Sequence, residues 1–172
     1  MANTIEQLGV GALGTLKAVK AGLNGLRGVF LHLAEEHGEL AALMKELSKS
    51  RDAQVRREHY PEIRAKLLAH EHAELSEVYS VLDSEDTREW VALHHQEAAN
   101  LETALRALDA LNPESDAWGL AFDRLFTLVA QHVDQEEQEL FPKAQAALGE
   151  EAAQALLTRY EAAKGAAKRP LQ

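Results

Sequence analysis

The chain has 172 residues, a length that suggests one domain with a substantial hydrophobic core. Its 28 acidic and 18 basic residues give a formal net charge of −10, which argues against nucleic acid and anionic membranes as partners. The absence of cysteine excludes disulfides, thiolate metal sites and iron–sulfur clusters within this chain. No signal peptide and no apolar run of about 20 residues is visible, so we expect a cytoplasmic protein.

The composition is that of a helical protein. Ala, Leu and Glu dominate, proline is scarce, and runs of β-branched residues are absent. We therefore expect residues 1–172 to form a single all-α domain. Its core, over about residues 15–145, is predicted to be an up-down-up-down four-helix bundle, followed by a short fifth helix at about 150–164.

The first predicted helix runs from about Thr4 or Leu13 to Leu47, because apolar residues recur there in steps of three and four. Its first part is rich in glycine, which favours a frayed or broken extension over close contact with another helix or subunit. The second helix follows a short polar break, has Pro61 at a kink or in its first turn, and extends to about Val81.

The later helices are delimited by capping and breaking residues. Ser84 is the predicted N-cap of the third helix, which ends before Pro113. Ser115 caps the fourth helix, and Pro142 marks its end. Gly149 separates the final amphipathic segment from the rest of the chain.

The pattern His-x-x-x-Glu occurs twice, at His70–Glu74 and at His132–Glu136. Residues four apart lie on one face of a helix, so each pair points an imidazole and a carboxylate the same way. Histidines also lie on the apolar stripes of the first and third helices. The candidate metal ligands are His37, His70, Glu74, His95, His132 and Glu136. Burying such groups is costly unless they are paired or bind a metal, so their convergence in one core predicts a metal site.

In the third helix, His94 is an alternative to His95. The residues that follow favour His95, with Ala98 three positions and Leu101 six positions later.

The other histidines are predicted not to be ligands. His72 lies about 200° around the helix from His70 and should face away. His32 is likewise predicted to be a non-ligand. His59 is either a partly buried core or surface residue or part of an access path.

Two further acids accompany the motifs. Glu71 and Glu137 are predicted to be solvated, or else to accept a hydrogen bond from a ligand imidazole.

From about Phe30 to Pro142 the chain resembles the hemerythrin-like (HHE cation-binding) domains. The resemblance rests on the ordered series His, His-x-x-x-Glu, His, His-x-x-x-Glu. The segments that carry it are Glu-Glu-His37, Leu-Leu-Ala-His70-Glu-His-Ala-Glu74, His95 and His132-x-x-x-Glu136-Glu-x-x-Leu-Phe-Pro142. It implies that the six candidate ligands hold two iron ions, with the two glutamates and an oxo, hydroxo or water bridge between them. The residue types alone also suit manganese, zinc or copper.

One departure from the oxygen-carrying hemerythrins bears on function. Those proteins have a second histidine one turn after the third-helix histidine, where this chain has Ala99. They also have an acid five residues after the last histidine, whereas Glu136 follows His132 by four. The chain therefore resembles the four-His, two-Glu branch, in which sensing, peroxide or nitric-oxide chemistry and iron handling are all represented.

The resemblance implies a non-haem diiron protein that binds or senses a small oxidant, which is O2, peroxide or NO. The alternatives are a diiron oxidoreductase acting on peroxide or NO, an iron donor or buffer, and a structural bundle. No nucleophile arrangement and no nucleotide motif is visible, so no catalytic residue is predicted and enzymatic activity stays open. We expect a monomer or homodimer without a nucleic-acid or membrane partner.

Overall fold

The computed structural model describes residues 22, 24–82 and 84–167. Its elements, in chain order, are α2 (Gly28–Lys49), α3 (Ala53–Ala73), η1 (Glu74–Val78), η2 (Tyr79–Val81), α4 (Arg88–Asp109), α5 (Asp116–Gln135), η3 (Glu136–Leu140) and α6 (Phe141–Ala167). The turns η1 and η3 are π-helical, and η2 is a 3-10 turn. These residues contain no strand, so the prediction of an all-α bundle is confirmed.

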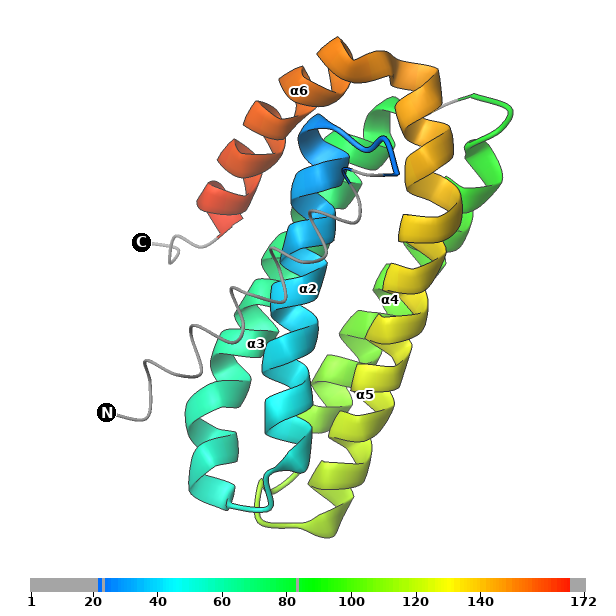
Figure 1. The fold of residues 1–172 in the computed structure, drawn as a ribbon. Helices are drawn as coiled ribbons and strands as arrows, with labels where there is room; N and C mark the ends of the chain where they lie inside the picture. The colour runs from blue at the N-terminus through cyan, green and yellow to red at the C-terminus, as the bar shows by residue number, and fades with distance from the viewer. Residues whose placement is uncertain (1–21, 23, 83, 168–172) are drawn as a thin grey trace.

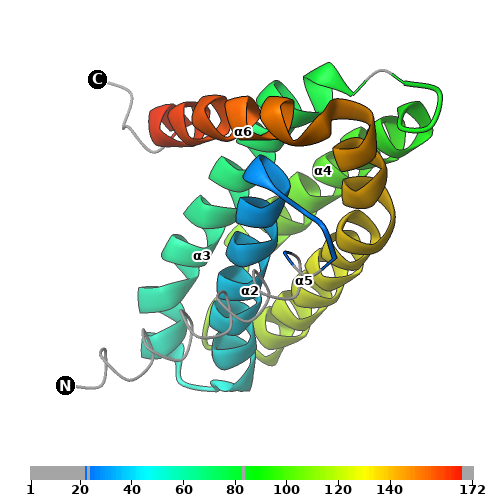
Figure 2. The ribbon, with the colours of Figure 1, turned by 45° about the horizontal axis from the view of Figure 1, so that its top comes forward.

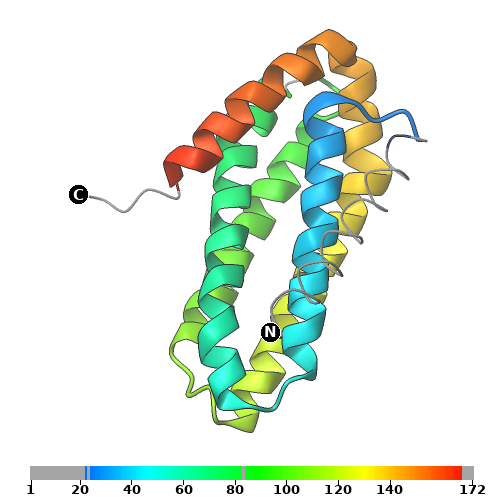
Figure 3. The same cartoon turned by 60° about the vertical axis from the view of Figure 1, so that its left-hand side comes forward.

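The helices α2, α3, α4 and α5 run up and down beside one another (Figure 1). A view from the side shows the long connection from α3 to α4 at one end of the bundle and the turns from α2 to α3 and from α4 to α5 at the other (Figure 3). The helix α6 continues upward from α5, bends, and crosses the end of the bundle over α2 and α3 (Figure 2). None of the described helices is long and apolar enough to cross a membrane.

The helix α2 begins at Gly28. Among the described residues just before it, the chain is broken rather than continuously helical, which agrees with the favoured prediction of a frayed or broken extension. The backbone turns at Gly25, which has φ of 87°, and Gly28 itself has φ of 55°. A Cβ atom on Gly28 would lie 2.4 Å from the carbonyl carbon and oxygen of Ala153 in α6. Glycine is therefore required where the start of α2 meets α6. The predicted starts at Thr4 and Leu13 lie outside the described residues.

Two of the predicted helix ends differ from the structure. The cap of α4 is Thr87, and Ser84 instead forms the preceding turn, in which its carbonyl accepts the Thr87 N–H at 3.2 Å. Pro142 does not end a helix, because it is the second residue of α6, where a missing N–H is tolerated. The break comes at Gly149, which has φ of 79°. Ser115 caps α5 as predicted, accepting the Trp118 N–H at 3.2 Å.

The buried core consists of two apolar clusters with a polar layer between them. One cluster lies toward α6 and includes Leu33 and Leu140, and the other includes Leu40 and Val129. On α2, His37 falls between Leu33 and Leu40, and the His132–Glu136 pair falls between Val129 and Leu140 in the same way. The apolar clusters close the two ends of the polar layer, which keeps bulk water away from it.

Candidate metal centre

Seven ionisable side chains meet in the polar layer. They come from four helices and from the first residues of the two π-helical turns, and all seven residues are buried. The seven residues are His37, His70, Glu71, Glu74, His94, His132 and Glu136. Five of the six predicted ligands are thus brought together, and His94 and Glu71 join them.

The cluster contains two overlapping groups of potential ligands, within each of which the donor atoms lie within 4.8 Å of one another. The first group is His37, His70 and Glu74, and the second is Glu71, Glu74, His94 and His132. Glu74 belongs to both. Glu136 lies between them, because its Oε2 is 3.3 Å from His37 Nε2 and 3.5 Å from His132 Nε2. Two carboxylates are therefore shared between two sets of imidazoles.

Both shared carboxylates stand at the first position of a π-helical turn. Glu74 opens η1 with its Oε2 3.3 Å from His70 Nε2, and Glu136 opens η3 with its Oε2 3.5 Å from His132 Nε2. Such turns are rare and occur frequently at functional sites. The same local backbone arrangement thus serves both His-x-x-x-Glu motifs.

The cluster contains buried polar atoms that protein groups do not satisfy. Among the described residues, six buried side-chain atoms have no hydrogen-bond partner: Glu71 Oε2, Glu74 Oε1 and Oε2, His94 Nε2, His132 Nε2 and Glu136 Oε2. All six belong to the seven residues of the polar layer. Each unsatisfied buried group costs about 1–3 kcal/mol. A cation would accept electron pairs from all of them, so this donor set fits a bound metal.

Three of the four histidines are held from the outside by a carboxylate at Nδ1. The pairs are His37 with Glu137 at 3.1 Å, His70 with Glu36 at 3.0 Å, and His132 with Glu97 at 2.9 Å. A hydrogen on Nδ1 donates to the carboxylate and leaves the Nε2 lone pair facing the interior. This arrangement fixes the ring orientation and the tautomer that a metal requires.

The structure places His94 in the cluster and leaves His95 exposed. The prediction that the His95 ring faces the core is therefore wrong. The Nδ1 of His94 is 3.3 Å from Glu136 Oε1, and its Nε2 is 3.7 Å from Glu71 Oε2. Its ring stacks on Tyr79 with the centroids 3.9 Å apart. The physical reason is the heptad-like stripe of α4, on which Ala98 lies four residues after His94.

Substitution separates these two neighbouring histidines. His94→Ala should lower metal affinity by about tenfold or more, since even residues that only support a ligand are worth that much. His95→Ala should leave affinity within about twofold, because its ring is exposed. Titration of the metal-free variants with Fe²⁺ under anaerobic conditions measures both values. Equal losses in the two variants would contradict the placement of His94.

Glu71 is buried, so the prediction that its side chain is solvated is wrong. Its Oε1 lies 3.3 Å from His132 Nε2. The sequence carried a signal for this position, because Glu71 follows the buried Leu67 by four residues and so shares its face. Glu137 accepts a hydrogen bond from His37, which is the second role predicted for these two acids.

The carboxylates within the cluster differ in their ionisation. Burial, together with the nearby Glu136 and Glu71, raises the pKa of Glu74 well above its usual range. Burial also opposes ionisation of Glu136, but the imidazoles of His132, His94 and His37 outweigh it and lower the pKa of Glu136. Without a cation, burial and the neighbouring carboxylates therefore favour the protonated form of Glu74, and a metal bound there would displace that proton.

The helix α6 reaches back to the cluster through two side chains. The Tyr160 hydroxyl donates to Glu36 Oε2 at 2.6 Å and lies 2.9 Å from His70 Nδ1. Lys164 forms an ion pair with the same carboxylate. Both residues follow the bend at Gly149, so the crossing part of α6 fixes the carboxylate that orients His70.

Removing the Tyr160 hydroxyl tests this support. Tyr160→Phe should weaken metal binding by about tenfold, because Glu36 then loses a donor that fixes its position beside His70. Tyr60→Phe is a matched control, since the Tyr60 hydroxyl donates at 2.8 Å to Asp109, a residue outside the cluster. Both variants should lose about 1 kcal/mol of stability. An equal metal affinity in the two variants, measured by titration, would assign Tyr160 a purely structural role.

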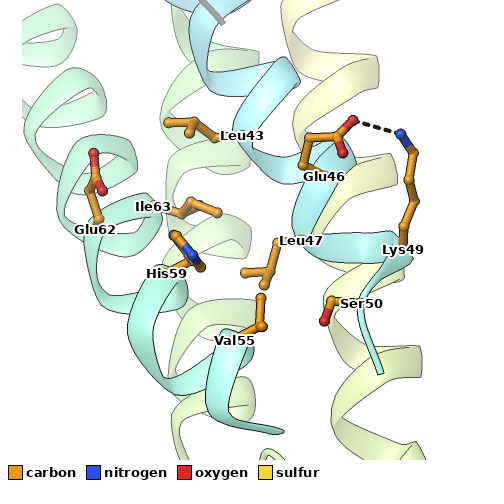
Figure 4. Close-up of a pocket in the computed structure, with 9 residues that line it drawn as sticks. All are labelled: Leu43, Glu46, Leu47, Lys49, Ser50, Val55, His59, Glu62 and Ile63. Atoms are coloured by element: carbon orange, nitrogen blue, oxygen red, sulfur yellow. Dashed lines mark hydrogen bonds and ion pairs between the residues drawn. The ribbon is translucent and has the colours of Figure 1, made fainter. Parts of the chain in front are cut away.

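His59 lies in a groove away from the cluster. The groove has a volume of about 320 Å³ and lies between α2 and α3 near their connecting turn, with Leu43, Leu47 and Ile63 on its walls (Figure 4). None of the seven cluster residues lines it. His59 is thus a partly buried residue in a groove that does not include the cluster.

The comparisons with known proteins agree with this geometry. The family model of the hemerythrin HHE cation binding domain matches residues 29–144. The chain is also 29% identical over 133 residues to a DNA nickase from Nostoc sp. (strain PCC 7120 / SAG 25.82 / UTEX 2576), a match that covers 75% of this chain and 37% of that protein. The chain thus spans well under half the length of this relative, and no solved structure matches it. The match over most of the helical core, together with the buried His and Glu cluster, places this chain in the hemerythrin HHE cation-binding domain family.

Proposed function

We propose that this chain is a non-haem diiron protein that binds or senses a small oxidant, which is O2, peroxide or NO. The observation that carries the proposal is the sharing of Glu74 and Glu136 between two groups of histidines. One cation would need only one such group. Two groups joined by two carboxylates are suited to a pair of cations close together.

Iron is the metal we propose, because imidazole and carboxylate donors suit it and because the family resemblance favours it. Bound iron would supply reversible binding or one-electron chemistry toward a small oxidant. The seven side chains offer too few donor atoms to fill two octahedral ions, which leaves positions for a small ligand. The chain's own part is to hold the imidazole rings through their outer carboxylates and to exclude bulk water.

The charge of the donor set favours ligand binding over iron storage. Ferritin-type bundles use four carboxylates and two histidines, whereas this cluster has three carboxylates and four histidines. Fewer negative charges should stabilise the ferrous pair relative to those sites. A reduction potential well below that of a ferritin-type site would contradict this expectation.

The first test is metal content and the visible spectrum of protein purified with and without added ferrous iron in air. We expect about two irons per chain, with ferric absorption in the near ultraviolet. Zinc or no metal, with no spectrum after reconstitution, would contradict the proposal.

Addition of O2, peroxide and NO to the reduced protein then distinguishes a binding protein from an oxidoreductase. The spectrum of a binding protein shifts reversibly, whereas an oxidoreductase consumes the ligand with steady turnover. Iron that is released readily and shows neither response would favour the donor or buffer.

The similarity to the DNA nickase supports a second candidate, which is metal-dependent nicking of DNA. The net charge of −10 disfavours contact with a phosphate backbone and is the reason for placing this candidate second. Conversion of supercoiled plasmid to the open-circular form by the iron-loaded protein, but not by its Glu74→Ala variant, would favour nicking over oxidant binding.

A further inference from the structure

A groove opens between α4 and α5 beside the metal cluster. It has a volume of about 440 Å³ and is lined by both helices and by the end of α3. Two of its lining residues, Glu71 and His132, are members of the cluster. Their side chains are only 9% and 8% exposed, and each has a polar atom without a hydrogen-bond partner. The groove therefore leads from solvent to unsatisfied ligand atoms.

The lining of this groove carries negative charge and neutral oxygen donors. Glu97 lies beside His132 with 25% of its side chain exposed, and Asp134 is exposed. The amide side chains of Asn100, Gln131 and Gln135 complete the polar part of the lining. No lysine or arginine occurs among the residues that line it. Carboxylate and amide oxygens are the groups that replace water around a hydrated divalent cation.

The groove between α2 and α3 provides a contrast. Its lining has two glutamates, Glu46 and Glu62, but also Lys49 and four apolar side chains, and it contains no residue of the cluster. Of these two grooves, only the one between α4 and α5 combines acidic walls with a direct connection to the potential ligands.

We propose that the groove between α4 and α5 is the route by which divalent cations reach the cluster, with Asp134 and Glu97 holding a hydrated cation before it passes to Glu71 and His132. The inference rests on the proposed metal site. A cleft lined by one sign of charge concentrates oppositely charged ions and raises their rate of association by about 10–1,000-fold. The residues at its mouth should therefore control how fast metal is taken up, while the buried ligands control how much is held.

The test is the rate of Co²⁺ uptake by the full chain after removal of metal, followed by stopped-flow absorbance without oxygen. Asp134→Lys should slow uptake by about tenfold or more at low ionic strength and should slow it less as salt is added. Gln131→Glu should speed uptake severalfold. The matched control is Asp123→Lys, which makes the same charge change at an exposed position of α5 that does not line the groove. It should change the rate less than about twofold.

A second variant tests the route sterically. Asn100→Trp places a bulky side chain in the groove and should slow uptake, while Gln96→Trp, one turn earlier on α4 and outside the lining, should not. Every variant should reach the same final Co²⁺ content as the unmodified chain.

The outcomes separate the two proposals. If all variants take up metal at the rate of the unmodified chain, or if Asp123→Lys slows uptake as much as Asp134→Lys, the route is wrong and the metal site stands. If the unmodified chain takes up no Co²⁺ and no iron, the metal site and the route are both wrong.

Discussion

Glu74→Gln should abolish metal loading and at the same time stabilise the metal-free protein. Glu74 is fully buried, belongs to both ligand groups, and has no hydrogen-bond partner at either oxygen. Glutamine has nearly the same shape but cannot supply a carboxylate to two cations. In the metal-free protein it removes a group that is crowded against Glu71 and Glu136, and its amide N–H groups can donate to them. We expect a gain of about 1–3 kcal/mol in the free energy of unfolding without metal.

Urea unfolding of chelator-treated and iron-loaded protein, together with metal analysis, measures both effects. Glu62→Gln is the control, because it makes the same change on α3 at a side chain that is 59% exposed. It should alter neither quantity. Glu74→Ala and Glu136→Ala should also lose the metal, whereas His72→Ala should retain it. Metal content equal to that of the unmodified chain in all of these variants would overturn the assignment of the cluster.

Gly28→Ala should be the most destabilising substitution to alanine at a glycine of the described chain. The new Cβ would lie 2.4 Å from the Ala153 carbonyl, where backbone rather than a flexible side chain must move. The residue also has φ of 55°, a conformation that costs alanine about 1–2 kcal/mol. Overpacking adds about 1–3 kcal/mol, so we expect a total loss of about 2–5 kcal/mol.

Gly149→Ala isolates the conformational part of this loss. Gly149 also has a positive φ, of 79°, but a Cβ there would meet nothing within 4 Å. With ψ of 172° it lies in a region that is essentially restricted to glycine, so we expect a loss of about 1–3 kcal/mol. Denaturant unfolding of the two variants gives the difference, and an equal loss in both would show that α6 yields to the clash without cost.

The helices α2, α3, α4 and α5 could be predicted from the sequence because their apolar residues recur in steps of three and four. The choice between His94 and His95 was also available in that periodicity. At about 100° per residue, His94 lies within about 40° of Ala98, Leu101, Leu105 and Leu108, while His95 lies roughly 100° away from their mean direction. Even Ala98 and Leu101 alone lie closer to His94, at about 40° and 20°, than to His95, at about 60° and 120°.

Other features of the site had no clear signal in the sequence. The π-helical turns depend on how Glu74 and Glu136 are held in the assembled core, and local propensity does not encode this. The carboxylates that orient His70 and His132 come from other helices, Glu36 from α2 and Glu97 from α4. Such pairs, 34 and 35 residues apart, are decided by tertiary packing, which single-sequence periodicity does not report.

The return of α6 to the cluster sets an order of events during synthesis. Glu36 is among the first residues of the bundle to be made, yet its partners Tyr160 and Lys164 follow it by 124 and 128 residues. A nascent chain that has reached Gly149 already contains all seven cluster residues, and His32 beside Glu36, but lacks the two groups of α6 that contact Glu36. Contacts so distant in sequence form late, because a long loop must close first. Full organisation of the metal centre is thus expected only after α6 has been synthesised and has left the ribosome.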